Sequence, residues 1–229
     1  MKDLKAIVFD RDGTLLDYSD MFLTFILDIH KSEGVMPPGT ETILSLEYWQ
    51  EIISGKLLIG SVTVREHIDA IPRSYMRLGK FYPRIRETLQ MLQQAGLNMT
   101  ILSGWVGTEA TQNFIVQQGL RECFSLIVTC DELEELKIAD HQSIGYLSAK
   151  KQLLNKTIQF LGVNPDEILV VGDSPEDIEA GKSFNTKTAA VLTGSGHRVQ
   201  DKLESLKPDA ILPTAADLVN LVTFGKQQP

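Results

Sequence analysis

The chain has 229 residues, of which 43% are hydrophobic and 23% are charged. This composition excludes disordered, collagen-like and coiled-coil classes, and the length suits one large domain or a domain with a modest insert. There are 22 Lys and Arg residues against 30 Asp and Glu residues, which gives a net charge of −8. Because nucleic acids and anionic membranes are bound mainly through basic groups, this balance argues against both as partners.

The cysteines and the N-terminal residues also exclude several classes of protein. The two cysteines, Cys123 and Cys130, stand beside no cluster of histidines, so neither a disulfide scaffold nor a structural zinc site is expected. The N-terminal residues show no signal-peptide pattern, and no apolar run approaches the roughly 20 residues of a membrane helix. We therefore expect a cytoplasmic protein that is a monomer or a homodimer.

Short β-branched runs alternate with helical patterns along the chain, which is typical of an α/β fold with a doubly wound parallel sheet. Several of these runs are apolar throughout, as expected for strands that are covered on both faces. The predicted strands are, in chain order, Ala6–Phe9, Met99–Leu102, Leu126–Thr129, Ile168–Val171, Ala189–Leu192 and Ala210–Leu212.

Two stretches between these strands carry apolar residues at i, i+4 and i+7, and a glycine follows each of them, which predicts two helices with defined ends. The stripes are Ile85, Leu89 and Leu92 before Gly96, and Leu154, Ile158 and Leu161 before Gly162.

Residues 17–80 break the alternation, because they contain helical stretches and Gly or Pro breaks but no clear strand. An insert of this size directly after the first strand predicts a small all-helical second domain. We accordingly assign residues 1–16 and 81–229 to the α/β core and residues 17–80 to the insert.

The first motif with chemical content is Val8-Phe9-Asp10-Arg11-Asp12-Gly13-Thr14-Leu15. Two carboxylates two residues apart, at the end of a strand, can both face the crevice where open α/β sheets bind ligands. One carboxylate can attack phosphorus as a nucleophile, and the other can pass a proton to the leaving oxygen. Gly13 permits a sharp turn and Thr14 can donate to an anion. An ordinary Asp-Gly turn is the alternative.

The second motif is Val170-Val171-Gly172-Asp173-Ser174-Pro175-Glu176-Asp177, again a strand that runs into a helix. Ser174, Pro175 and Asp177 suit helix capping, but capping leaves Asp173 unexplained. A carboxylate above the crevice is costly unless it is paired, and a magnesium ion with oxygen ligands provides that pairing.

Two weaker signals follow the same geometry. Ser103 and Gly104 end the strand Met99–Leu102, where a hydroxyl and backbone N–H groups can hold a phosphate oxygen, although a turn is the commoner role. Lys150 or Lys151 precedes the helix that ends at Gly162, and a cation there can neutralise a transferring phosphoryl group. Each lysine alone is also compatible with an exposed position.

The four motifs together, in the order Asp-x-Asp, Ser, Lys and Gly-Asp-x-x-x-Asp, resemble the haloacid-dehalogenase-like (HAD) superfamily of aspartate-nucleophile phosphohydrolases. The likeness is greatest to the phosphoglycolate-phosphatase-like branch, and it covers nearly the whole chain. It includes Tyr82 through Gly96, Leu161 through Glu167, and the tail from Val191 to Ala210. The insert stands where that branch carries a helical cap.

The resemblance implies a magnesium-dependent phosphatase that acts on a small phosphorylated metabolite through an aspartyl-phosphate. Asp10 would be the nucleophile and a metal ligand, and Asp12 the general acid/base with its backbone carbonyl on the metal. Asp173 would complete the magnesium site, and Asp177 would hold the metal waters or the lysine. Alternatives on the same residues are a phosphomutase of the β-phosphoglucomutase type and a non-catalytic phosphate-ligand sensor.

The resemblance further implies that Thr14, Ser103, Gly104 and a lysine bind the phosphoryl group. Lys150, which lies 12 residues before Gly162, has the spacing closer to that of other HAD branches, so we assign this role to Lys150 rather than to Lys151.

The chain departs from the branch at three places. Arg11 stands where an apolar residue is usual, Arg84 stands where glycine is typical, and Ser148-Ala149-Lys150-Lys151 replaces the usual Lys-Pro. Substrate choice is expected to lie in the cap. Its cations Lys56, Arg65, Arg73 and Arg77 either bind a second anionic group or are exposed on helix faces, and Trp105 either lines the pocket mouth or packs against the cap.

Overall fold

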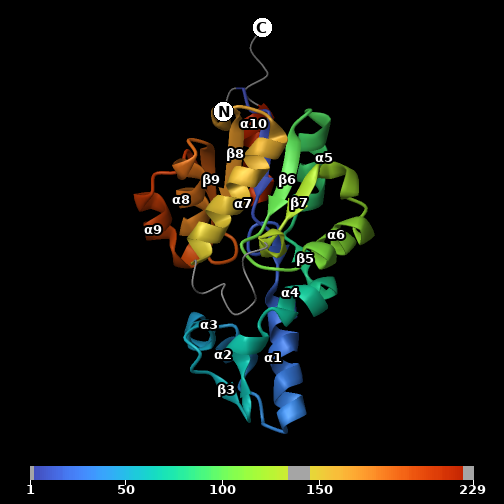
Figure 1. Ribbon diagram of the computed structural model, residues 1–229, viewed down its shortest axis with the longest axis vertical. Helices are drawn as coiled ribbons and strands as arrows, with labels where there is room; N and C mark the ends of the chain where they lie inside the picture. Colours follow the sequence, from blue (N-terminus) through green and yellow to red (C-terminus); the bar gives the residue numbers. More distant parts are fainter. Residues whose placement is uncertain (1–2, 134–144, 224–229) are drawn as a thin grey trace.

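The computed structural model of the protein describes residues 3–133 and 145–223, and a six-stranded sheet lies at its centre (Figure 1). The strand order is β10-β9-β8-β1-β6-β7, and all neighbours are parallel. The strands are β1 Ala6–Phe9, β6 Asn98–Leu102, β7 Leu126–Val128, β8 Ile168–Gly172, β9 Lys187–Val191 and β10 Ala210–Leu212. All six predicted strands are confirmed, with the largest difference at β9, which begins two residues earlier than expected.

The sheet is doubly wound, as predicted. Strand β1 lies in the middle, between β8 and β6, and Phe9 is in register with Val171 on one side and with Ile101 on the other. The chain proceeds outward from β1 to β6 and β7, then crosses back to β8 and continues outward to β9 and β10. The strand order therefore reverses between β1 and β8, and such a switch point opens a crevice at the carboxyl ends of the strands.

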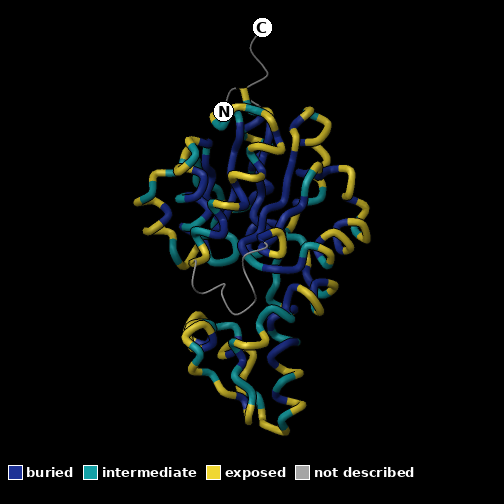
Figure 2. Tube along the Cα trace, viewed as in Figure 1, coloured by how far each residue is buried: buried dark blue, intermediate teal, exposed yellow. Residues whose placement is uncertain are grey.

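Helices cover both faces of the sheet, and alternate residues of β1 enter two separate cores. Ile7 and Phe9 pack in one core with α5 (Ile85–Gln94), α6 (Thr108–Gln117) and α10 (Leu218–Thr223). Ala6 and Val8 pack in the other core with α7 (Tyr146–Leu161). Figure 2 shows the strands as a continuous buried layer between more exposed helices. The core helices are α5 Ile85–Gln94, α6 Thr108–Gln117, α7 Tyr146–Leu161, α8 Pro175–Ser183, α9 Gln200–Ser205 and α10 Leu218–Thr223.

The two predicted helical stripes lie on α5 and α7, and both helices end near the expected glycines. Gly162 adopts a left-handed φ of 63° directly after α7, which glycine does without steric strain. Arg84 precedes α5 with a φ of 65°, a conformation in which a side chain is disfavoured. Glycine would adopt this conformation without steric strain, so Arg84 carries a backbone cost at this position.

Residues 17–80 form a predominantly helical unit below the sheet in Figure 1. Its hydrophobic residues are contiguous with the core of α5 and α6, and α4 contacts α6. Where the chain leaves the core and returns to it, β2 (Leu16–Asp17) pairs antiparallel with β5 (Lys80–Phe81). The helices of this insert are α1 Ser19–Glu33, α2 Thr40–Ile43, α3 Leu46–Ile53 and α4 Ala70–Ser74.

The insert also contains a short hairpin that the sequence did not predict. Strands β3 (Leu58–Ile59) and β4 (Val62–Thr63) pair antiparallel around a turn, and Gly60 takes a φ of 59° there. The carboxylate of Glu33 accepts hydrogen bonds from the backbone N–H and the hydroxyl of Ser61, both at 2.8 Å. Strands of two residues are too short to display the alternation by which a strand is predicted.

Two further expectations concern the whole chain. Cys123 and Cys130 are both buried free thiols. Within residues 3–133 and 145–223, no helix has the length and apolar character needed to span a bilayer.

Candidate active site

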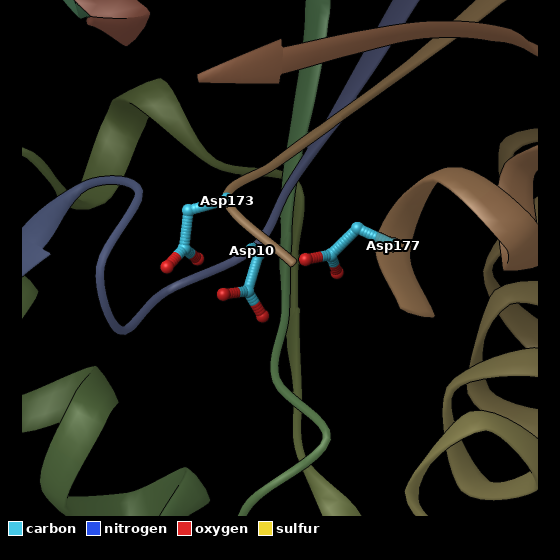
Figure 3. Close-up of side chains that lie close together, drawn as sticks. All are labelled: Asp10, Asp173 and Asp177. Atoms are coloured by element: carbon cyan, nitrogen blue, oxygen red, sulfur yellow. The ribbon is translucent and has the colours of Figure 1, made fainter. Parts of the chain in front are cut away.

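Three aspartates converge at the switch point of the sheet. Asp10 follows β1, Asp173 follows β8, and Asp177 lies in the first turn of α8; each offers a carboxylate oxygen, and these oxygens lie within 4.8 Å of one another. Figure 3 shows the Asp10 carboxylate between the other two. All three side chains are almost fully buried, at 5%, 5% and 3% exposure. The structure thus brings these motif carboxylates together at the carboxyl ends of the strands, as predicted.

Lys150 supplies the positive charge beside this cluster. Its ammonium donates to Asp10 Oδ1 at 3.0 Å and also to Asp177 Oδ1, and the side chain is only 1% exposed. Lys151, by contrast, is partly exposed. Burial alone would lower the pKa of Lys150, but the attraction of Asp10 and Asp177 outweighs it and raises that pKa well above the usual value. Of the two lysines, the structure brings Lys150 to the aspartates. Both lysines lie within α7, which begins at Tyr146, and not before that helix as expected.

Hydrogen bonds from two loops hold the Asp173 carboxylate. Its Oδ1 accepts from the hydroxyl of Thr14 at 3.2 Å, and its Oδ2 accepts from the backbone N–H and hydroxyl of Ser195 at 2.7 and 2.9 Å. The fully buried Thr14 thus joins the β1 loop to the β8 loop. Sequence reasoning included Thr14 as a phosphate ligand but missed Ser195, whose only signal was its place after the Thr193-Gly194 pair.

The two carboxylate oxygens of Asp177 have different hydrogen-bond partners. Its Oδ2 accepts from the backbone N–H of Ser174 at 3.2 Å and from the Ser174 hydroxyl at 2.6 Å, which completes the predicted capping arrangement at α8. Its Oδ1 accepts from Lys150. A Cβ at Gly172 would lie 2.1 Å from Asp177 Cγ, so glycine at that position is what lets Asp177 approach. Asp177 therefore caps α8 and contacts Lys150 at the same time.

Asp12 is held by the residue before it. Nε and Nη2 of Arg11 both donate to Asp12 Oδ2, at 2.9 and 2.6 Å, and the hydroxyl of Ser103 lies 3.5 Å from the same oxygen. Arg11 is 0% exposed, which agrees with its place where an apolar residue is usual in the branch that the chain resembles. The other Asp12 oxygen, Oδ1, is buried without a hydrogen-bond partner among the described residues.

Ser103 and Gly104 follow β6, next to β1. The Ser103 hydroxyl accepts from the backbone N–H of Trp105 at 3.1 Å, and the residue is 1% exposed. A Cβ at Gly104 would lie 2.4 Å from the Tyr146 ring and 3.0 Å from Cε of Lys150. Glycine at this position therefore allows α7 to bring its lysine close to the carboxyl ends of the strands.

The aspartate cluster carries more negative charge than Lys150 can balance. Burial raises the pKa of Asp10 well above its usual value, and the attraction of Lys150 offsets this only in part. Burial, together with repulsion from Asp177, raises the pKa of Asp173 to about 6. One ammonium faces three buried carboxylates, so negative charge is in excess. The atoms that could bind a metal ion are all oxygens, which are the ligands that small divalent cations prefer. The site is therefore chemically suited to such a cation.

A cleft of about 1150 Å³ opens beside these residues, between the sheet and the insert. Asp10, Asp12 and Asp173 form part of its floor, and Trp49, Ile68 and other residues of the insert form the opposite wall. Trp105 lies at the junction, where its Nε1 donates to Asp69 Oδ1 at 3.0 Å and its ring meets that of Trp49 edge-on at 6.1 Å. Trp105 thus both lines the cleft and packs against the insert.

The four cations singled out in the insert differ in their surroundings. Arg73 donates to Asp131 Oδ1 at 2.9 Å and so ties the insert to the core. Lys56 and Arg77 are exposed and do not line the cleft. Arg65 does line it, and it is the only Lys or Arg among the described lining residues.

Gly194 packs closely against both the loop that follows β1 and the loop that follows β8. Its φ is 55°, and a Cβ there would lie 2.4 Å from both Asp173 Oδ2 and Gly13 Cα. We expect Gly194→Ala to lower the free energy of unfolding by about 1–3 kcal/mol and to reduce activity, because backbone strain and displacement of Asp173 add together. Urea denaturation and a phosphatase assay measure the two effects.

Gly119→Ala is the matched control for this substitution. Gly119 has a similar φ of 68°, but a Cβ there would meet nothing within 4 Å. This variant should therefore carry the backbone strain alone and keep wild-type activity. Equal losses of stability and activity in the two variants would contradict the close packing of Gly194 against Asp173.

Comparison with known proteins places the chain in a family. The model of the family described as haloacid dehalogenase-like hydrolase matches residues 7–191. The chain is similar to the pyrophosphatase PpaX of Bacillus cereus (strain AH820), with 30% identity over 96% of this chain and 97% of the relative. It is also similar to the pyrophosphatase PpaX of Halalkalibacterium halodurans, with 26% identity over the same shares.

Solved structures show the same fold. A predicted phosphoglycolate phosphatase from Haemophilus somnus superimposes with a TM-score of 0.72 at 21% identity, covering 96% of this chain and 99% of the other. A HAD phosphatase from Thermococcus onnurineus gives a TM-score of 0.65 at 19% identity, covering 96% and 98%. With the family model spanning the sheet from β1 to β9 and all four motifs in place, the chain belongs to the haloacid dehalogenase-like hydrolase family.

Proposed function

We propose that the protein is a magnesium-dependent phosphatase that hydrolyses a small-molecule phosphomonoester through an aspartyl-phosphate at Asp10. The observation that carries the proposal is the cluster of three buried aspartates with one buried lysine, at the switch point of the sheet and on the floor of a large cleft. Such a cluster is unfavourable in an apolar interior unless a further cation balances its excess negative charge.

The chain's own residues divide the reaction between them. Asp10 attacks phosphorus while Asp12 protonates the leaving oxygen, and Asp12 then takes a proton from the water that releases phosphate. Ser103, Gly104 and Thr14 would bind the phosphoryl group, and Lys150 would neutralise charge on the transferring group. Asp177 holds Lys150 in place.

Mg²⁺ fits the donors present. Asp10, Asp173 and the backbone carbonyl of Asp12 would hold it, and when bound it supplies positive charge that stabilises the phosphoryl oxygens. Asp177 would lie beside the metal site and hold Lys150, because its Oδ1 accepts from that ammonium while its Oδ2 accepts from Ser174.

Residues 17–80 would act as the cap. The insert forms one wall of the cleft, so its closure would exclude bulk water and limit the enzyme to compact substrates. We further propose a small phosphorylated metabolite as the physiological partner and a cytoplasmic location, as expected from the sequence.

Inorganic pyrophosphate is a second candidate substrate. It is favoured by the similarity to the pyrophosphatases PpaX, which extends over nearly the full length of both chains. The same aspartates would serve, with phosphate itself as the leaving group. Phosphate release from a panel of p-nitrophenyl phosphate, phosphoglycolate, sugar phosphates, nucleotides and pyrophosphate separates these substrates, and a phosphomutase would instead return an isomeric sugar phosphate.

Removal of divalent cations should abolish the activity. In excess EDTA we expect phosphate release from p-nitrophenyl phosphate to fall to background, because Lys150 alone then faces three carboxylates and the charge of the phosphoryl group. Added Mg²⁺ in excess over the chelator should restore the rate. Full activity in EDTA would remove the metal from the proposal, and a lack of hydrolysis of every substrate with Mg²⁺ present would overturn the phosphatase itself.

Arg65 should discriminate between substrates with one and two anionic groups. No ion pair to Arg65 occurs among residues 3–133 and 145–223, and its place in the cleft wall lets it meet a second phosphate or a carboxylate. Loss of one charge-assisted hydrogen bond of about 1.5–3 kcal/mol predicts that Arg65→Ala raises KM for phosphoglycolate or pyrophosphate roughly 10- to 100-fold. The KM for phenyl phosphate should change little.

Arg77→Ala is the control, because Arg77 is an exposed cation of the same insert outside the cleft lining. It should leave the KM of both substrates close to the wild-type values. If Arg65→Ala changed the KM of phenyl phosphate as much as that of phosphoglycolate, recognition of a second anion by Arg65 would be refuted.

A further inference from the structure

Arg11 is the largest fully buried side chain of the described chain. A guanidinium without any exposed surface is expensive to desolvate, so its hydrogen bonds should satisfy it. They run in two directions. On one side Nη1 donates to the carbonyl of Val106 at 3.0 Å and to the hydroxyl of Thr111 at 2.7 Å. On the other side Nε and Nη2 both donate to Asp12.

The first pair of contacts anchors the guanidinium to rigid structure. Val106 is a buried residue in the loop after β6, and Thr111 lies in α6. The Thr111 hydroxyl in turn donates to the carbonyl of Gly107, so it is fixed by its own helix. Asp12 lies in a turn that follows β1. Because the guanidinium of Arg11 is bound to α6 on one side and to Asp12 on the other, it fixes Asp12 relative to α6.

The second pair of contacts makes the two oxygens of Asp12 unequal. Oδ2 accepts both bonds from Arg11, and the hydroxyl of Ser103 lies 3.5 Å away. Oδ1 is buried and has no partner among the described residues. A buried carboxylate oxygen without a partner requires an explanation, and Asp12 lines the cleft, so a substrate or water oxygen that enters there can provide the missing partner.

We propose that Arg11 is a positioning residue that fixes the Asp12 carboxylate and reserves Oδ1 for proton exchange, an inference that rests on the proposed phosphatase function. In the first step the bond from phosphorus to the leaving oxygen breaks, the bond from phosphorus to Asp10 forms, and the proton on Oδ1 moves to the leaving oxygen. In the second step water adds to phosphorus, its proton returns to Oδ1, and the bond to Asp10 breaks to release inorganic phosphate.

The test compares two aryl phosphates of similar shape in the variant Arg11→Met, which keeps the stem but loses the donors. The nitro group of p-nitrophenyl phosphate stabilises the departing phenolate, so this substrate needs a general acid less than phenyl phosphate does. We use kcat/KM because it reports the steps through leaving-group departure. The ratio of kcat/KM for p-nitrophenyl over phenyl phosphate should rise roughly tenfold, since general acid catalysis is then impaired.

A double-mutant cycle with Asp12→Asn supplies the second readout. If Arg11 acts through Asp12, adding Arg11→Met to Asp12→Asn should change kcat/KM for phenyl phosphate by less than about twofold, because the effects of residues that act as a unit do not add. Independent, multiplying losses would overturn the proposal. A uniform loss on both aryl phosphates in Arg11→Met would likewise mean that the arginine only holds the loop together.

Arg86→Met is the control, because Arg86 also makes side-chain hydrogen bonds, to Gln118, but lies outside the cleft lining. Its substrate ratio should equal that of the wild type. If Arg11→Met does not fold, Arg11→Lys carries the test: the lysine keeps the charge but cannot present two donors to Oδ2, so a raised ratio supports positioning and a wild-type ratio refutes it. Failure of the phosphatase function itself would appear separately, as wild-type protein that hydrolyses neither aryl phosphate.

Discussion

Asp10→Asn is expected to abolish hydrolysis of phosphomonoesters, with kcat reduced at least about 1,000-fold, as is usual when a covalent nucleophile is removed. An asparagine cannot form the acyl phosphate, although it fills nearly the same space between Asp173 and Asp177. The measurement is phosphate release from p-nitrophenyl phosphate with Mg²⁺, together with acid-quench trapping of labelled phosphoprotein. Wild-type protein should trap label, and the variant should not.

The stability of this variant distinguishes lost chemistry from lost folding. Burial raises the pKa of Asp10 in the folded protein, so above its unfolded-state pKa the ionised carboxylate lowers the stability of the metal-free fold. Replacement by a neutral amide should therefore leave the free energy of unfolding in EDTA at neutral pH equal to the wild-type value or above it. An inactive variant with a markedly lower free energy of unfolding would not count as evidence for a nucleophile.

Glu176→Gln is the matched control for Asp10→Asn. Glu176 lines the same cleft but does not belong to the aspartate cluster. Removing its charge should change kcat by no more than several-fold. Wild-type hydrolysis by Asp10→Asn would overturn the mechanism, and an equal loss in Glu176→Gln would show that only the total negative charge of the cleft matters.

Lys150→Met and Lys151→Met are expected to differ strongly. Methionine keeps the apolar stem of Lys150 but leaves Asp10 and Asp177 without their ammonium partner, which should lower the free energy of unfolding in EDTA by about 3–5 kcal/mol. Loss of a preorganised charge at the phosphoryl group should also lower kcat roughly 100- to 1,000-fold with Mg²⁺ present.

Lys151→Met, one residue along the same helix, should stay within about 0.5 kcal/mol of wild type in unfolding and keep its activity. Urea denaturation and phosphate release measure both variants side by side. Equal and mild losses in the two would refute the assignment of Lys150, because the ion pairs to Asp10 and Asp177 belong to that residue alone.

The sequence predicts the sheet and the meeting of its motifs because both follow from local rules. Parallel strands bring their carboxyl ends to one edge, so Asp10, Ser103 and Asp173 had to approach one another once each was placed after a strand. Helical periodicity also points to Lys150, which stands four residues before Leu154 on the stripe that α7 buries. The neighbouring Lys151 is rotated away from that stripe.

The remaining features depend on contacts between residues far apart in the chain. The partners of Arg11 include Thr111, 100 residues away, and Ser195 reaches Asp173 across 22 residues. No local pattern encodes such pairs, because the partners are distant in the chain. The hairpin of the insert was not predicted for a different reason, because strands of two residues show no periodicity in the sequence.

The edge-on contact between Trp49 and Trp105 has a practical consequence. The chain has only two tryptophans, and they meet where the insert faces the loop after β6. Each indole therefore forms part of the surroundings of the other. Movement of the insert away from the α/β core would expose both indoles to solvent. The intrinsic fluorescence of the unlabelled protein is thus a direct optical signal for opening and closing of the cleft, and no dye needs to be attached.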